Sequence, residues 1–130
     1  MGAPRQRPEG AAAPIRTGER EPQVAADGSS VRELAHPDWS PARNLSLAEA
    51  TVAPGEATRL HRHRRSEEIY LFTAGRGQMT LGEERFAVSA SDCVVIAPGT
   101  PHRLVNDGDE PLVLLCCCAP AYSEADTELL

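Results

Sequence analysis

The stretch HRHRRSEEIY, residues 61–70, contains two histidines, three arginines and two glutamates. By charge it is a basic run followed by an acidic pair, which is typical of a solvated surface. Its spacing indicates something else, because side chains two positions apart on a β-strand point to the same face. His61 and His63 would then share one face, and Glu68 and Tyr70 would share a face of the next strand. The stretch therefore predicts two strands that present imidazoles and a carboxylate.

A third imidazole, His102, follows the turn APGTP about forty residues later. A short connection between the first two strands would let them lie side by side, so that the imidazoles and one carboxylate converge. Glu67 would be the carboxylate if the loop were one residue shorter, but alternation with Tyr70 favours Glu68. Three neutral imidazoles and a carboxylate suit Fe, Mn, Zn, Ni or Cu, and the set lacks the thiolates of a closed structural zinc site.

Short apolar or alternating runs fill the chain from residue 28 onward, separated by turn signals such as Pro54-Gly55 and Pro98-Gly99. Many short strands without a helical period indicate an all-β sandwich or barrel. GRG at residues 75–77 is expected to be a hairpin turn and not a phosphate loop, because no helix follows it. The expected strands are residues 31–35, 45–53, 58–63, 68–73, 78–81, 85–88, 93–96, 102–105 and 112–118.

The length of 130 residues predicts one domain with an extension at each end. Residues 1–27 are rich in Pro, Gly, Ala and charge, so they bury too little to order and should form a flexible tail. Residues 28–122 should form the β-barrel domain, and residues 123–130 a C-terminal extension. In that extension Ser123 and Asp126 resemble a capping box, although the segment can equally stay extended.

The composition excludes several classes of partner. The formal net charge of -6 gives no field that would attract a phosphate backbone, so nucleic acid is not an expected partner. No apolar run reaches the roughly 18 to 20 residues of a membrane span, and the N-terminus lacks the apolar core of a signal peptide. We therefore expect a cytoplasmic protein with no membrane partner.

The four cysteines are Cys93 and the consecutive Cys116, Cys117 and Cys118. Consecutive cysteines are a poor disulfide framework, because neighbours on a strand point to opposite faces. We interpret them as small buried apolar side chains in a reducing compartment. The run LVLLCCC is too continuous for a half-exposed strand, which predicts burial on both faces, in the barrel or at a dimer contact.

The same residues carry a resemblance to the cupin superfamily. Gly55, five residues, His61-x-His63, four residues, Glu68, six residues and Gly75 match the first cupin motif in every position. The resemblance implies a cupin double-stranded β-helix, a small jelly-roll barrel of two antiparallel sheets. It also implies a metal held near the open end of the barrel.

The stretch PGTPHRLVN, with Gly99, two residues, His102, three residues and Asn106, resembles the second cupin motif. Ser91 stands where that motif usually opens with a glycine. The resemblance covers roughly residues 44–118, and it implies one divalent transition metal ion, Fe, Mn, Zn or Ni. Carried over residue by residue, it implies the metal ligands His61, His63, Glu68 and His102.

The resemblance implies a small organic substrate, but the fold does not determine the reaction. Our leading hypothesis is a dioxygenase-like oxidoreductase whose substrate chelates the metal through two oxygens. One alternative is a non-redox isomerase, lyase or polyketide cyclase, in which Glu68 moves a proton, and another is a non-catalytic binding or regulatory cupin. Small cupins commonly form homodimers, and an exposed sheet edge would favour such a contact. From strand alternation, the expected substrate pocket is Tyr70, Phe72, Met79 and Leu104.

Overall fold

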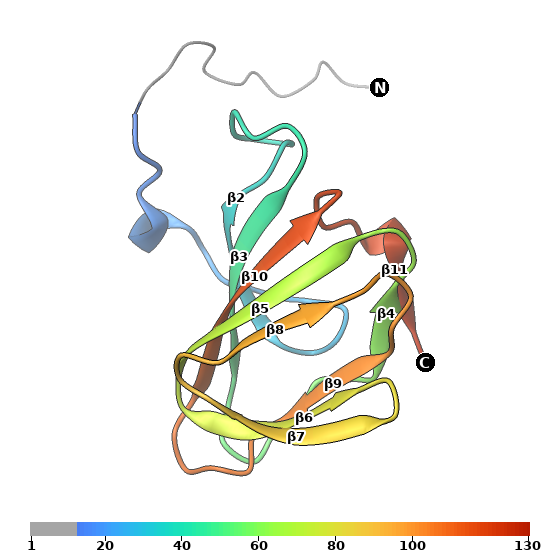
Figure 1. The fold of residues 1–130 in the computed structure, drawn as a ribbon. Helices are drawn as coiled ribbons and strands as arrows, with labels where there is room; N and C mark the ends of the chain where they lie inside the picture. Colours follow the sequence, from blue (N-terminus) through green and yellow to red (C-terminus); the bar gives the residue numbers. More distant parts are fainter. Residues whose placement is uncertain (1–12) are drawn as a thin grey trace.

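The structure is a computed structural model that describes residues 13–130, and strands are its main secondary structure (Figure 1). The helical pieces among these residues are two short 3-10 turns, η1 (Thr17–Glu19) and η2 (Glu124–Asp126). Within residues 13–130, no helix has the length and apolar character needed to cross a membrane. The strands are β1 (Gln23–Val24), β2 (Ser30–Ala35), β3 (Ser46–Val52), β4 (His61–His63), β5 (Glu67–Ala74), β6 (Arg76–Leu81), β7 (Glu84–Ser89), β8 (Cys93–Ile96), β9 (His102–Val105), β10 (Leu112–Ala119) and β11 (Thr127–Leu129).

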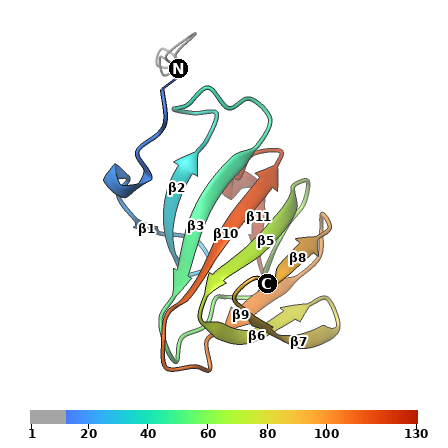
Figure 2. The ribbon, with the colours of Figure 1, turned by 60° about the vertical axis from the view of Figure 1, so that its left-hand side comes forward.

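The strands form two antiparallel sheets that pack face to face (Figure 2). One sheet has the order β1-β2-β3-β10-β5-β8, and the other has the order β11-β4-β9-β6-β7. This arrangement confirms the expected all-β jelly-roll class. Consecutive strands often belong to different sheets, so the chain crosses between the layers repeatedly.

Two expectations about neighbouring strands are wrong. The strands that carry His61 and Glu68 do not lie side by side, because β4 pairs with β11 and β9, whereas β5 pairs with β10 and β8. Residues 75–77 are not a hairpin turn either, since β5 and β6 belong to different sheets. Gly75 makes the crossing with φ +80, and a Cβ there would lie 2.3 Å from the carbonyl oxygen of Pro111. Only glycine fits this combination of backbone conformation and close approach.

Alternation along each strand sends one set of side chains between the sheets. On β5, Glu68, Tyr70 and Phe72 are buried, whereas Ile69 and Leu71 are each 39% exposed. Large aliphatic and aromatic side chains from both sheets meet in the interior, which stabilises the packing of the two layers. The buried apolar core consists of Ala50, Val52, Tyr70, Phe72, Met79, Val88, Ile96, Leu104, Leu112 and Leu114.

Ser91, at the position where the second motif usually opens with glycine, has a positive φ of 78. Its backbone therefore adopts the left-handed conformation that glycine adopts most easily. The backbone N–H of Ser91 donates to the carbonyl oxygen of Phe72 at 2.7 Å, which fixes the turn before β8. The substitution thus leaves the turn geometry of the motif in place.

Both ends of the described chain add strands to the sheets. β1 pairs with β2, so the six-stranded sheet begins before residue 28, within the segment expected to be a flexible tail. Residues 1–12 of that expected tail lie outside the described residues. At the other end, Ser123 accepts a hydrogen bond from the backbone N–H of Ala125 as η2 begins, and β11 then pairs with β4. The C-terminal segment thus combines a capped turn with a strand.

Candidate metal centre

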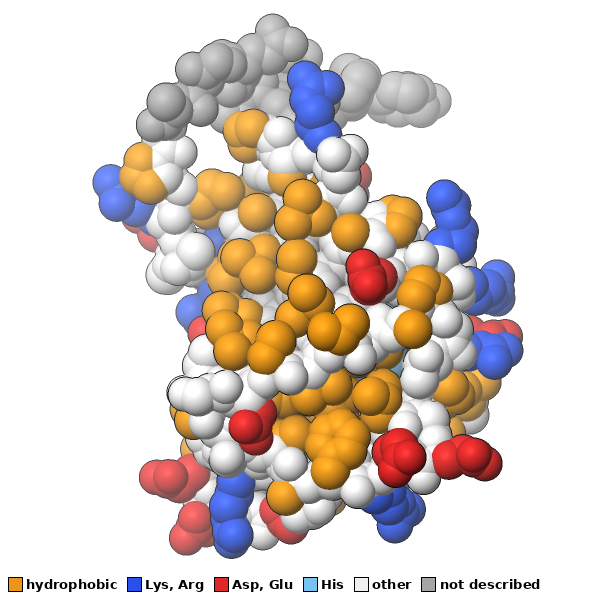
Figure 3. All heavy atoms as spheres, viewed as in Figure 1, with side chains coloured by type: hydrophobic (Ala, Val, Ile, Leu, Met, Phe, Trp, Pro, Cys, Tyr) orange, Lys and Arg blue, Asp and Glu red, His pale blue; other side chains and the backbone are white. Residues whose placement is uncertain are grey.

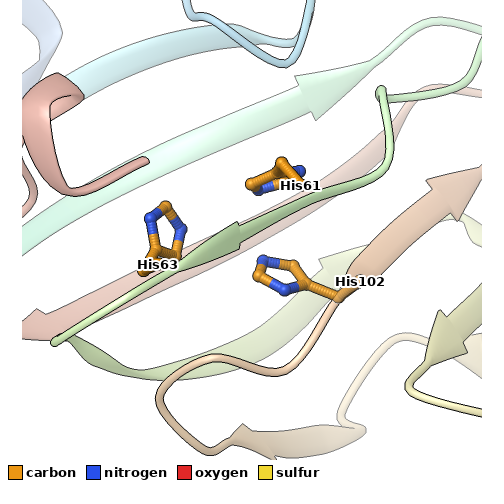
Figure 4. A group of neighbouring side chains, drawn as sticks. All are labelled: His61, His63 and His102. Carbon is orange, nitrogen blue, oxygen red and sulfur yellow. The ribbon is translucent and has the colours of Figure 1, made fainter. Parts of the chain in front are cut away.

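Three imidazoles meet between the sheets (Figure 4). His61 and His63 point inward from β4, and His102 points inward from β9, directly opposite His61 in the strand register. One ring nitrogen from each histidine lies within 4.8 Å of the others. All three side chains are buried, so their ring nitrogens are shielded from water. Such a cluster can hold a metal ion.

Backbone carbonyl groups orient two of the rings. The Nδ1 atom of His61 lies 2.8 Å from the carbonyl oxygen of Arg59, and the Nδ1 atom of His102 lies 2.9 Å from that of Thr100. A carbonyl oxygen only accepts, so each Nδ1 carries the proton. In the neutral ring, Nε2 then keeps its lone pair and is available as a metal ligand.

The third ring is oriented by the C-terminal strand. The Nδ1 atom of His63 lies 3.0 Å from the hydroxyl oxygen of Thr127 on β11. That hydroxyl donates its single proton to the carbonyl oxygen of Ser123 at 2.9 Å, so it accepts from His63. His63 therefore also carries its proton on Nδ1, which leaves Nε2 with a lone pair. All three rings thus share the tautomer that metal binding needs.

Glu68 approaches the imidazoles from the opposite sheet. Its Oε1 atom lies 3.2 Å from Nε2 of His63 and 3.4 Å from Nε2 of His102. Its Oε2 atom accepts a hydrogen bond from the thiol of Cys118 on β10 at 3.1 Å. Glu68 is buried, whereas the side chain of Glu67 is exposed. The carboxylate that faces the imidazoles is therefore that of Glu68.

The donor atoms fit a cation at their meeting point. Among residues 13–130, Glu68 Oε1 and His102 Nε2 are buried without a hydrogen-bond partner. A carboxylate oxygen and deprotonated Nε2 atoms would face one another with lone pairs only, which costs free energy unless a positive charge lies between them. A divalent metal ion supplies that charge, and this donor set suits Fe, Mn, Zn or Ni.

The pKa shifts of Glu68 and His61 indicate which forms these two groups take near neutral pH. Burial raises the pKa of Glu68, but interactions with His102 and His63 outweigh it and hold this pKa at about 2. Burial lowers the pKa of His61, and so does the repulsion that a protonated His102 ring would exert on it. Near neutral pH the carboxyl group is therefore ionised and the His61 ring is neutral, which are the forms that bind a metal.

A cavity of about 230 Å³ opens beside the histidines. Of the side chains expected to form a pocket, Tyr70 and Leu104 line this cavity, whereas Phe72 and Met79 belong to the apolar core. Phe72 and Met79 face the interior as their alternation predicts, but they lie away from the cavity. Alternation gives the face of a residue and not its distance from the site.

Several residues at the cavity were not predicted from the sequence. Cys116 and Cys118 line it, and their spacing of two on a strand that contains Leu114 was a signal for this inward face. Asp27 and Thr127 also line it, from the two ends of the chain. No sequence pattern marks either residue, because both reach the cavity through strand pairing between segments that are distant in sequence.

Comparison with known proteins places this geometry in a family. The model of the cupin domain family matches residues 48–118. The chain is 49% identical over 110 residues to the uncharacterized protein MJ1618 of Methanocaldococcus jannaschii, covering 85% of this chain and 88% of that protein. It is 30% identical over 102 residues to oxalate decarboxylase OxdC of Bacillus subtilis, covering 75% of this chain but only 26% of that protein.

Solved structures support the same assignment. A deletion variant of Bacillus subtilis oxalate decarboxylase OxdC matches 88% of this chain and 31% of its own, with a TM-score of 0.75 and 26% identity. Pac13, described as a nucleoside dehydratase, matches 92% of each chain with a TM-score of 0.73, and at 19% identity this likeness shows the fold alone. The family match covers more than half of the chain, and the expected motifs lie within the barrel it describes. The protein therefore belongs to the cupin domain family.

Proposed function

We propose that the protein is a metal-dependent enzyme that acts on a small organic molecule. Its metal ligands would be His61, His63 and His102 through Nε2, together with Glu68 through Oε1. The observation that carries this proposal is the set of four buried donor atoms whose lone pairs meet beside a cavity. A group of this kind needs a cation, and the adjacent space admits a ligand.

For the reaction, we propose dioxygenase-like chemistry on a substrate with two metal-binding oxygens. When bound, a divalent ion at these ligands would supply Lewis acidity and, as iron, reactivity toward dioxygen. The chain's own contribution is to fix the imidazoles by their Nδ1 hydrogen bonds and to keep Glu68 ionised. The small apolar side chains of Ala48 and Ala50, with Leu114, line the cavity and keep water from a reactive ligand.

A non-redox reaction, namely isomerisation, lyase chemistry or cyclisation, is the second candidate. The observation that favours it is a second carboxylate at the cavity: Asp27 lines the cavity, and its Oδ2 lies 3.8 Å from Nε2 of the proposed ligand His61. Two carboxylates with different surroundings can divide the roles of proton donor and acceptor. In this reaction Glu68 would move a proton when its Oε1 leaves the metal, while its Oε2 stays hydrogen-bonded to Cys118.

The test is turnover by one preparation under two conditions. The purified protein is loaded with Fe(II) and assayed for oxygen consumption with a panel of enols, diketones and catechols. The same panel is then given to the Zn(II)-loaded protein without oxygen. Oxygen uptake that disappears in His102→Ala supports the dioxygenase-like reaction, and anaerobic turnover with Zn(II) supports the non-redox one. Ligand binding without turnover, unchanged in His63→Ala, would contradict both and indicate a binding module.

We also propose that the protein is a homodimer through the outer face of the six-stranded sheet. Hydrophobic side chains gather over β3, β10 and β5 on this face (Figure 3). Ile69 and Leu71 are each 39% exposed, and Val95 is 58% exposed. An apolar patch of this kind favours contact with another protein surface. Light scattering after gel filtration should give the mass of two chains, and Leu71→Glu combined with Val95→Glu should give the mass of one.

A further inference from the structure

Asp27 places a second carboxylate at the proposed metal site, outside both sequence motifs. Its Oδ2 atom lies 3.8 Å from Nε2 of His61, and its side chain is 13% exposed. Its Oδ1 atom accepts hydrogen bonds from the backbone N–H of Ser29 at 3.0 Å and from the hydroxyl of Ser29 at 2.6 Å. The carbonyl oxygen of Asp27 accepts from the backbone N–H of Arg59 at 2.8 Å. The side chain is therefore held from one side.

The other oxygen of this carboxylate faces the cavity. Oδ2 lies 3.8 Å from His61 Nε2, which exceeds hydrogen-bond distance. His61 Nε2 carries no proton in the tautomer fixed by Arg59, so it cannot donate to Asp27. When a bound molecule displaces water from this oxygen, the carboxylate needs a hydrogen-bond donor in place of the water. A molecule bound in the cavity can provide one through a hydroxyl, amine or amide group.

The cavity offers no free positive side chain to a substrate. Among the described residues that line it, Arg20 is the only arginine or lysine. Its guanidinium lies 3.7 Å from the ring centroid of Trp39, and its Nε donates to the carbonyl oxygen of Glu33 at 3.1 Å. Arg20 is therefore committed to contacts within the protein. A divalent ion with Glu68 carries one net positive charge, and Asp27 cancels it.

This balance of charge discriminates between ligands. A ligand with two negative charges would leave the buried site with a net charge of minus two, without a side chain to neutralise it, and burial of unpaired charge is costly. A ligand with one charge or none avoids that cost. The volume of about 230 Å³ also indicates the scale of the ligand, since a cavity of about 150 Å³ holds a benzene molecule. The substrate should then be comparable to a single-ring molecule.

We propose that Asp27 determines substrate specificity: the cavity accepts a small molecule with at most one negative charge and a hydrogen-bond donor beside its metal-binding oxygens, and it disfavours dicarboxylates such as oxalate. The donor binds Oδ2 of Asp27, which is supplied by the N-terminal segment and not by the matched cupin domain region. This inference rests on the proposed metal site, and it adds the class of molecule which that site selects.

The test compares two ligands of the same shape on the full-length Zn(II)-loaded protein. Oxalate carries two carboxylates, whereas oxamate has one carboxamide in place of a carboxylate, so it has one charge fewer and an N–H donor. Isothermal titration gives the dissociation constant of each ligand for the wild type and for Asp27→Asn. The asparagine keeps an acceptor for Ser29 and removes the charge. The ratio of the oxalate constant to the oxamate constant should fall about tenfold or more in the variant.

Two further variants and two further measurements make the outcome decisive. Glu83→Gln, which removes one carboxylate from a turn far from the cavity, should leave the ratio at the wild-type value. Zinc content measured after each titration shows that oxalate has not removed the metal. Thermal melting shows whether Asp27→Asn is folded. Asp27→Glu is a second variant, which keeps the charge and should preserve the preference for oxamate. A zinc-loaded Asp27→Asn protein with an unchanged ratio would overturn the role of Asp27 alone, whereas failure to bind zinc would overturn the metal site itself.

Discussion

The two walls of the proposed metal site are built in different ways. The five-stranded sheet supplies three imidazoles, and each is fixed by a hydrogen bond at Nδ1 to a carbonyl group or to Thr127. The six-stranded sheet supplies one carboxylate, and the thiol of Cys118 holds it through a single weak hydrogen bond. The first wall is therefore rigid, and the second allows its ligand more freedom.

This difference indicates how the site divides its tasks. Rigid imidazoles with fixed tautomers favour tight retention of the metal. A carboxylate with one weak partner can change its orientation when a ligand enters the cavity, because little free energy is lost when a thiol hydrogen bond breaks. We expect the histidine wall to dominate metal affinity and the glutamate wall to influence ligand exchange.

The largest expected effect is the loss of an imidazole. His102→Ala removes a ligand at the centre of the cluster and should weaken zinc binding by about a hundredfold or more, beyond the effect of losing an outer partner. Competition with a zinc-binding dye gives the affinity. His36→Gln is the matched control, because His36 is buried and hydrogen-bonded to the carbonyl oxygen of Tyr122 but is not one of the three clustered imidazoles. If His36→Gln lost the metal and His102→Ala kept it, the assignment of the site would be wrong.

The next effect concerns the carboxylate. Glu68→Gln keeps the shape of the side chain but removes its charge, so zinc affinity should fall by about ten- to a hundredfold. Glu67→Gln, one position earlier on the exposed face of β5, should leave the affinity unchanged. Equal affinities for the two variants would contradict the contribution of Glu68 to the site.

A smaller effect is expected from the partner of His63. Thr127→Val removes the acceptor for Nδ1 while it keeps the volume of the side chain, and it should lower zinc affinity by about tenfold because the ring loses its fixed tautomer. The control is Thr80→Val on β6, where the same substitution affects a half-buried side chain outside the cavity lining. An unchanged zinc affinity in Thr127→Val would show that the C-terminal strand does not affect metal binding by His63.

The smallest effect is expected at the thiol. Cys118→Ala should lower zinc affinity by about threefold, because Glu68 loses one weak hydrogen bond. Cys118→Ser restores a donor and should recover the wild-type value. Cys117→Ala changes the next residue on the opposite face of β10, away from the cavity lining, and serves as the control. A large loss in Cys118→Ala that serine does not restore would contradict a role limited to hydrogen bonding.

The local alternation of residues in the sequence was sufficient to predict most of the strands and the inward direction of the four proposed ligands. It was sufficient because alternation in HRHRRSEEIY separates His61 and Glu68 from the arginines, whichever strands become neighbours. The same alternation could not predict contacts between segments that are distant in the sequence. The position of β5 in the opposite sheet, the hydrogen bond between Thr127 and His63, and the approach of Asp27 depend on pairing between strands far apart in the sequence, which no short pattern encodes.

X-ray absorption at the zinc edge of the Zn(II)-loaded protein tests the central claim most directly. Three imidazoles and one carboxylate predict a first shell of nitrogen and oxygen only, at about 2.0 to 2.2 Å, with the multiple scattering of histidine rings. The thiols of Cys116 and Cys118 line the same cavity and are the competing ligands. A sulfur scatterer at about 2.3 Å would contradict the account, because it would place the metal on the cysteine side of the cavity.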